Sequence, residues 1–145
     1  KMTSAEFNAA DAANYDGFAL GCPAMGAEQL EESEFEPMYQ DLRGSLSGKP
    51  VGLFGSYGWG DGEWIRTWAE DAQAAGARLV ADPVMANGAP DGDASDACNA
   101  ALFKFPTIAF LLNIDPMQNR RTVAAARRFC CCRGGGEGGI PKVPA

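Results

Sequence analysis

The sequence predicts one α/β domain built on a parallel sheet, and two repeated patterns lead to this fold class. Apolar runs that read as buried strands, at residues 16–21 and 51–54, are each followed by a turn that contains glycine. The second turn leads into residues 64–75, where apolar side chains recur at helical spacing. Strands that alternate with helices are typical of βαβ units, whose strands run parallel. A chain of 145 residues with 46% hydrophobic residues can build such a domain.

The first half of the chain reads as a connection, a strand and a helix. Residues 1–14 are polar and rich in alanine, and residues 8–13 predict a short helical turn before the 16–21 strand. Ser33 and Glu36 form a capping-box pattern that opens a helix, with Pro37 in its first turn. Five apolar side chains then fall on one face of that helix: Phe35, Met38, Tyr39, Leu42 and Leu46.

The second half repeats this alternation around the 51–54 strand. The helix after that strand is expected to end near Gly76, a residue typical of helix C-termini. Residues 78–81 and 84–85 predict a strand that is interrupted at Pro83, and such a proline is tolerated at an edge of a sheet. A turn follows, with Asp91 as the expected cap of a last helix at residues 93–102.

Residues 55–64 combine four glycines with Trp59, a large apolar ring with no obvious element to bury it. In open parallel sheets, ligands bind at the carboxyl ends of the strands, which is where this loop lies. One interpretation is that Trp59 stacks on a planar heterocycle. The other is that the loop is a simple turn whose tryptophan packs into the core.

Two long runs together resemble the short-chain flavodoxins of anaerobic bacteria. The runs are GCPAMGAEQLEESEFEP, at residues 21–37, and GLFGSYGWGDGEW, at residues 52–64. The resemblance covers roughly residues 5–103, and it implies a flavodoxin-like three-layer sandwich with a parallel sheet. It also implies that the first strand, the first helix and most of the second strand of that fold are absent. The phosphate loop of this family has a Thr-Gly-Asn-Thr type sequence, which occurs nowhere in the chain.

The resemblance implies FMN as cofactor and assigns residues to it from two loops, the first after the 16–21 strand and the second after the 51–54 strand. From the first loop, Met25 would pack on the inner face of the flavin ring, although plain core filling is the alternative. The backbone of Gly26 and Ala27 would contact flavin N5, and the carboxylate of Glu28 would hold N3–H. From the second loop, the implied cofactor residues are Ser56, near the phosphate or ribityl chain, Tyr57, Gly58, Trp59, stacked on the outer face, and Gly60.

Asp61 and Glu63 stand directly before the helix that follows this loop. We expect them to cap that helix. We also expect them to place uncompensated negative charge near the ring, which disfavours an anionic reduced flavin by Coulomb repulsion. A low second reduction potential would follow.

The charge and the cysteines narrow the possible partners and the compartment. The net charge is −7, and the acidic residues gather in residues 1–100, which argues against nucleic acid or an anionic membrane as partner. The acidic residues 1–100 suit docking to basic patches on redox proteins, and we expect the protein to be a monomer.

The five cysteines form no CxxC pair, and the chain has no histidine, so neither a zinc site nor a His-dependent triad is expected. Cys22 is expected to be a small buried residue, and we expect a reducing, cytoplasmic compartment. The chain starts at Lys1, which suggests a processed, excised or incomplete sequence.

Residues 104–145 depart from the family pattern and are predominantly basic, with a run of low complexity at residues 130–139. The leading interpretation divides the chain into a partial flavodoxin-like domain at residues 1–103 and an extraneous tail. The alternative places a strand at residues 107–112 in the central slot beside residues 18–20, followed by a loop and a helix at 120–129. Such a repair would be structural only.

The function that the resemblance implies is one-electron transfer between redox proteins through bound FMN, by a carrier rather than an enzyme. Two alternatives remain. One is a truncated flavodoxin-like fragment without cofactor, which the missing phosphate loop suggests. The other is the flavin module of a larger quinone or NAD(P)H oxidoreductase.

Overall fold

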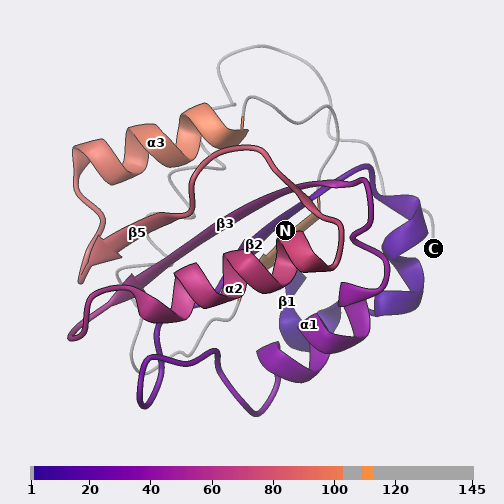
Figure 1. Cartoon of the computed structure of the whole chain (residues 1–145), viewed down its shortest axis with the longest axis horizontal. Coiled ribbons are helices and arrows are strands. Elements are labelled where there is room, and N and C mark those ends of the chain that lie inside the picture. The colour runs from indigo at the N-terminus through magenta and orange to yellow at the C-terminus, as the bar shows by residue number, and fades with distance from the viewer. Residues whose placement is uncertain (1, 103–108, 113–145) are drawn as a thin grey trace.

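The computed structural model describes residues 2–102 and 109–112 of the chain, which form a sheet flanked by helices (Figure 1). The strands are β1 (Met2–Thr3), β2 (Phe18–Gly21), β3 (Pro50–Tyr57), β4 (Arg78–Leu79), β5 (Val84–Asn87) and β6 (Ala109–Leu112). The helices are the 3-10 turns η1 (Ser4–Glu6) and η2 (Ala9–Asn14) and the α-helices α1 (Phe35–Arg43), α2 (Glu63–Ala74) and α3 (Gly92–Leu102). The predicted α/β class is confirmed.

All strand pairs of the described sheet are parallel, and the order is β1-β6-β2-β3-β4, with β5 also on β3. β4 pairs with the start of β3 and β5 with its end, so they form one edge strand split in two, as predicted. If β6 counts as the first strand, the order is 2-1-3-4-5. This is the order of flavodoxin-like doubly wound sheets, for which flavodoxin itself is a standard example.

The central position of the sheet is occupied by β6, which comes from the end of the chain. Its residues pair with β2 from Phe18↔Ala109 to Gly21↔Leu112, and with β1 at Leu111 and Leu112. The slot that we expected to be left open by a missing first strand is therefore filled. This pairing agrees with the alternative that placed residues 107–112 beside residues 18–20. The loop and helix of that alternative lie outside the described residues, and the boundary at residue 103 stays a prediction.

The core lies between the sheet and the helices α1 and α2, which lie in front of the strands in Figure 1. All four residues of β2 are buried, as expected for a strand inside a parallel sheet. Phe35 and Tyr39 of α1 meet Trp68 of α2 edge to face, with ring centroids 5.4 and 5.8 Å apart. Burial of each large side chain stabilises the fold by roughly 1.5–3 kcal/mol.

The ends of the helices differ partly from their predicted caps. α1 begins after Glu34, which makes no side-chain cap. Instead, the carboxylate of Glu31 accepts hydrogen bonds from the amides of Ser33, Glu34 and Phe35 at 2.7–2.9 Å. The predicted capping box at Ser33 is therefore wrong, because an earlier carboxylate already occupies the free amides. The predicted end of α2 near Gly76 is confirmed, since Gly76 has a left-handed φ of 87°.

The described helices are all too short or too polar to cross a lipid bilayer.

Candidate functional site

The candidate site lies where β2 and β3 end at the same edge of the sheet. β3 is longer than predicted and continues through Gly55, Ser56 and Tyr57, which we expected in the loop. The extension has a pairing partner, because residues 54–57 form a parallel ladder with β5. Ser56 and Tyr57 are therefore half-buried strand residues, and of the cofactor residues predicted after residue 55, Gly58, Trp59 and Gly60 remain in the loop.

The turn after β2 is a tight loop that β3 holds in place. Met25 and Gln29 exchange two backbone hydrogen bonds of 2.9 Å, which close residues 25–29 into a small hairpin, here called the 25–29 turn. Within it Gly26 and Glu28 have positive φ values of 48° and 53°. The amide of Ala24 donates to the carbonyl oxygen of Ser56 at 2.8 Å, so the turn is fixed to the end of β3.

Below this turn the two strands come unusually close. A Cβ at Gly55 would overlap the carbonyl oxygen of Cys22, so glycine is required there. The same carbonyl oxygen accepts a 3.2 Å hydrogen bond from Nε1 of Trp64, whose ring lies 5.7 Å from that of Tyr57. Cys22 is 1% exposed, which confirms its prediction as a buried residue.

The loop after β3, residues 58–62, carries a strongly exposed aromatic side chain, that of Trp59. The side chain of Trp59 is 63% exposed, so the interpretation of Trp59 as a core residue is wrong. Gly60 and Gly62 hold the backbone in left-handed conformations, with φ values of 89° and 90°. The loop therefore presents the tryptophan ring outward at the carboxyl edge of the sheet.

The two loops are joined by the carboxylate of Glu28. Its Oε1 accepts hydrogen bonds from the amides of Gly62 and Glu63 at 2.8 and 3.2 Å, and its Oε2 lies 3.4 Å from the amide of Asp61. The expected capping of α2 by Asp61 and Glu63 is therefore wrong, because Gly62 is the N-cap residue without a side-chain bond. The sequence carries no signal for this contact, since more than thirty residues separate its partners.

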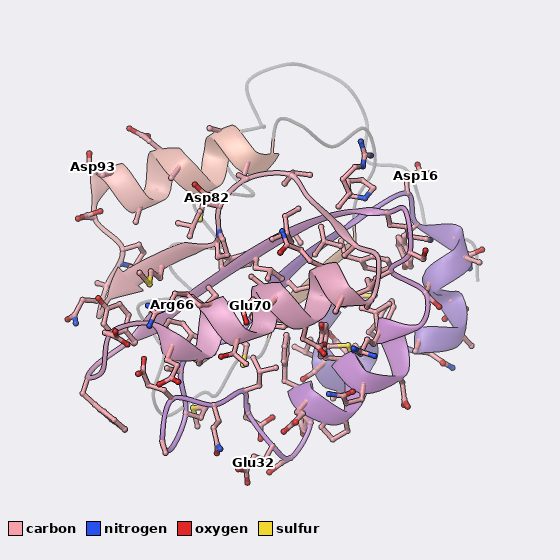
Figure 2. The ribbon with its side chains drawn as sticks, in the orientation of Figure 1. Asp16, Glu32, Arg66, Glu70, Asp82 and Asp93 are labelled. Atoms are coloured by element: carbon pink, nitrogen blue, oxygen red, sulfur yellow. The ribbon has the colours of Figure 1, made fainter. Side chains whose placement is uncertain are left out.

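The charge of Asp61 is compensated, contrary to our expectation. Arg66 of α2 lies 3.0 Å from the carboxylate of Asp61 and also donates to its carbonyl oxygen at 2.8 Å. Figure 2 shows Arg66 near the end of α2 that adjoins the loop. Both side chains are more than half exposed, so the ion pair contributes at most about 1 kcal/mol. Of the two acids, Glu63 forms no ion pair with any other described residue.

Among the predicted site residues, those of the first loop lie together in one turn. Met25, Gly26, Ala27 and Glu28 share the 25–29 turn, and the bonds of Ala24 and Glu28 tie this turn to the end of β3 and to the 58–62 loop. Gly26 and Ala27 are exposed, whereas Met25 and Glu28 are half-buried. Their roles toward a cofactor stay predictions.

The described residues offer neither a cluster of metal ligands nor, at Cys98, a reactive thiolate. No cluster of cysteine, aspartate and glutamate side chains there could hold a metal ion. Burial raises the pKa of the Cys98 thiol to about 11, so this cysteine stays protonated at neutral pH.

Comparison with known proteins gives close matches over part of the chain. No protein-family model matches. Over 84 residues, 58% of its length, the chain is 49% identical to the flavodoxin of Megasphaera elsdenii. Over 78 residues, 54% of its length, it is 50% identical to the flavodoxin of Clostridium beijerinckii. These matches span 61% and 56% of the two flavodoxins, so the chain covers less than two thirds of either.

A solved structure extends the match. The solution structure of two-electron reduced Megasphaera elsdenii flavodoxin is 32% identical and superposes with a TM-score of 0.51, over 87% of this chain and 72% of that protein. The chain belongs to the flavodoxin family. The predicted resemblance and the flavodoxin-like α/β fold are thereby confirmed. Because the strand order of flavodoxins is reached here through β6, this family member builds its central strand from residues 109–112.

Proposed function

We propose that this chain holds the flavin ring of FMN between its two strand-end loops and carries single electrons between redox proteins. The observation that supports this most is the exposed ring of Trp59, on a glycine loop at the carboxyl edge of the sheet. Ligands of doubly wound sheets bind at this edge. A tryptophan ring that is 63% exposed offers a face on which a flat heterocycle can stack.

The described residues suit such a ring. Met25 lies in the turn tied to β3, and its flexible thioether side chain packs well against aromatic faces. Oε1 of Glu28 already accepts two amides, whereas Oε2 accepts one long bond of 3.4 Å and keeps room for a ring N–H. When bound, FMN would supply the electron chemistry, and these side chains would orient the ring and set its surroundings.

No described residues are comparably suited to bind the phosphate of FMN. The Thr-Gly-Asn-Thr type loop is absent from the sequence, and the residues after β6 lie outside the described part of the chain. We therefore propose that contacts to the ring, from Met25, Glu28 and Trp59, supply most of the affinity. The contacts of Ser56, Tyr57, Gly58 and the backbone of Gly26, Ala27 and Gly60 belong to the same proposal.

The partners in this proposal are redox proteins with basic docking patches, and the chain acts as a cytoplasmic monomer. The excess of acidic over basic residues in residues 1–100 supports this choice. Complementary charge speeds encounter, and salt screens it. Electron transfer to such a partner should therefore slow as the ionic strength rises.

The test is a titration of FMN and of riboflavin, followed by flavin fluorescence, on the wild type and on Trp59→Ala. We expect both ligands to bind with similar affinity, and the variant to lose on the order of tenfold for each, since about 1.4 kcal/mol of stacking is a factor of ten. The exposed position of Trp59 makes a folding defect in the variant unexpected, and circular dichroism checks this. Absence of flavin binding by the wild type would refute the proposal in favour of a fragment without cofactor.

A second assay separates the carrier from an enzyme. We expect no steady-state oxidation of NADH or NADPH by the flavin-loaded chain, with quinone or ferricyanide as acceptor. Sustained turnover would instead identify the chain as the flavin module of an oxidoreductase.

A further inference from the structure

The carboxylate of Glu28 belongs to one loop of the site but closes the start of a helix in the other. Its three contacts, to the amides of Asp61, Gly62 and Glu63, are those that a capping side chain would make at the first turn of α2. A negative charge at this end of a helix is also favoured by the helix dipole. The 25–29 turn and the 58–62 loop are thus connected by charge-assisted hydrogen bonds.

No local side chain competes for this role in the described structure. Gly62, the N-cap residue, has no side chain, and Asp61 is held by Arg66. The left-handed φ of Gly62 turns successive amides toward one acceptor. The first turn of α2 therefore depends on a carboxylate supplied from the 25–29 turn.

Two backbone features are fitted to this contact. Glu28 has a φ of 53°, a left-handed conformation that is strained for a residue other than glycine. Gly60 lies directly against the carboxyl group, and a Cβ there would overlap it. Left-handed backbone on both sides of the contact indicates that its geometry, as well as the charge, matters to the two loops.

We propose that Glu28 is a positioning residue that assembles the site before any ligand arrives. Its Oε1 fixes the spacing between the 25–29 turn and the 58–62 loop, and its Oε2 retains acceptor capacity for the ligand. This inference rests on the proposed function for the identity of the ligand, but not for the contact itself. A ligand that stacks on Trp59 then meets a loop pair that is already ordered, which lowers the entropy lost on binding.

The test measures hydrogen exchange at the amides of Gly62 and Glu63 in the full chain without ligand. Glu28→Gly removes the carboxylate and also relieves the positive φ, so this variant should fold readily. We expect exchange at these two amides to rise at least tenfold, with exchange in β2 and β3 unchanged. Glu28→Gln should restore part of the protection, because its carboxamide oxygen still accepts hydrogen bonds.

Glu32→Gln is the matched control. Glu32 lies in the same connection, is exposed and points away from both loops in Figure 2, so the variant removes an equal charge without touching α2. Its exchange should equal that of the wild type. Unchanged exchange at Gly62 and Glu63 in Glu28→Gly, or an equal rise in Glu32→Gln, would overturn the inference.

A titration with FMN and riboflavin completes the test. We expect Glu28→Gly to weaken both ligands at least tenfold, and tighter or unchanged binding would overturn the role of Glu28 in assembling the site. If the wild type binds neither flavin, the proposed function fails. The exchange data still decide whether Glu28 joins the two loops.

Discussion

At Gly55 the end of β3 runs against the carbonyl oxygen of Cys22, and no side chain fits between them. We predict that Gly55→Ala pushes the end of β2 away from β3 and lowers the free energy of unfolding by about 1–3 kcal/mol, the usual cost of overpacking. Urea unfolding measures this. Gly44→Ala is the control, because a Cβ at Gly44 meets nothing within 4 Å and its φ is helical. Equal stability of the two variants would contradict the close approach.

Glu31 makes the stability of the chain depend on pH. Partial burial raises its pKa, but hydrogen bonds from the amides of Phe35, Glu34 and Ser33 outweigh this and hold the pKa below the ordinary 4.5. A carboxylate whose folded pKa is depressed stabilises the fold above the unfolded pKa, and this contribution is lost as the pH falls through the folded value. The stabilisation is therefore complete at neutral pH and disappears in acid.

We predict that Glu31→Gln lowers the free energy of unfolding by about 1 kcal/mol at pH 7, the usual value of an N-cap. The difference from the wild type should shrink below pH 4.5 and vanish below the folded pKa. Thermal or urea unfolding over a pH series measures it. Glu32→Gln provides the control, and a difference that persists unchanged in acid would rule out the capping role.

At the scale of elements, α1 and α2 are linked by a polar cluster above their aromatic contact. Asp71 of α2 accepts two hydrogen bonds from Arg43 and one from the hydroxyl of Tyr39, each at 2.8 Å. The hydrogen bonds from Arg43 lower the pKa of Asp71, and they outweigh its partial burial. Burial and the neighbouring carboxylate raise the pKa of Tyr39. The cluster therefore holds an ionised carboxylate and a neutral phenol at neutral pH.

We predict a small favourable coupling free energy between Arg43 and Asp71, because both side chains remain more than a third exposed and solvent screens the pair. The measurement is a double-mutant cycle of Arg43→Gln and Asp71→Asn at pH 7. Since the folded pKa of Asp71 lies below 3.8, the coupling should be complete above that pH and fall in stronger acid. No coupling at pH 7, or one that grows in acid, would contradict this.

At the scale of the whole molecule, the sheet depends on its sixth strand. β6 pairs with β2 on one side and with β1 on the other, so β1 reaches the sheet only through β6. Leu111 lies opposite both Met2 and Leu20. A residue near the carboxyl end of the described chain therefore holds a residue near its beginning.

We predict that Leu111→Pro lowers the free energy of unfolding by about 2 kcal/mol or more, because proline cannot donate to a central ladder. Leu111→Val is the control, since it keeps the amide and suits a strand. Guanidinium unfolding compares the two, and hydrogen exchange in β2 should rise in the proline variant alone. Equal stability of both variants would show that β6 is dispensable.

The local elements of this chain were predictable because short-range patterns specify them. The apolar run of β2, the split edge strand β4–β5, the end of α2 at Gly76 and the cap of α3 at Asp91 were each read correctly from neighbouring residues. The predicted strand at residues 51–54 is shorter than β3, because the glycine-rich residues 55–57 suggest a loop. Their pairing with β5 makes them part of the strand. The runs at residues 21–37 and 52–64 also indicate the family, by resemblance.

The tertiary structure alone decided how distant segments meet. Glu28 accepts hydrogen bonds from the amides of Asp61, Gly62 and Glu63 across a sequence separation at which local patterns carry no information. The pairing of β6 with β2 was one of two alternatives that the sequence left open, and the structure decided between them. The sequence by itself determined the fold class and the residues at the carboxyl edge of the sheet, because periodicity and turn chemistry are properties of adjacent residues. Which carboxylate caps which helix, and which strand fills the centre, depends on packing, where all segments compete for the same hydrogen-bonding groups.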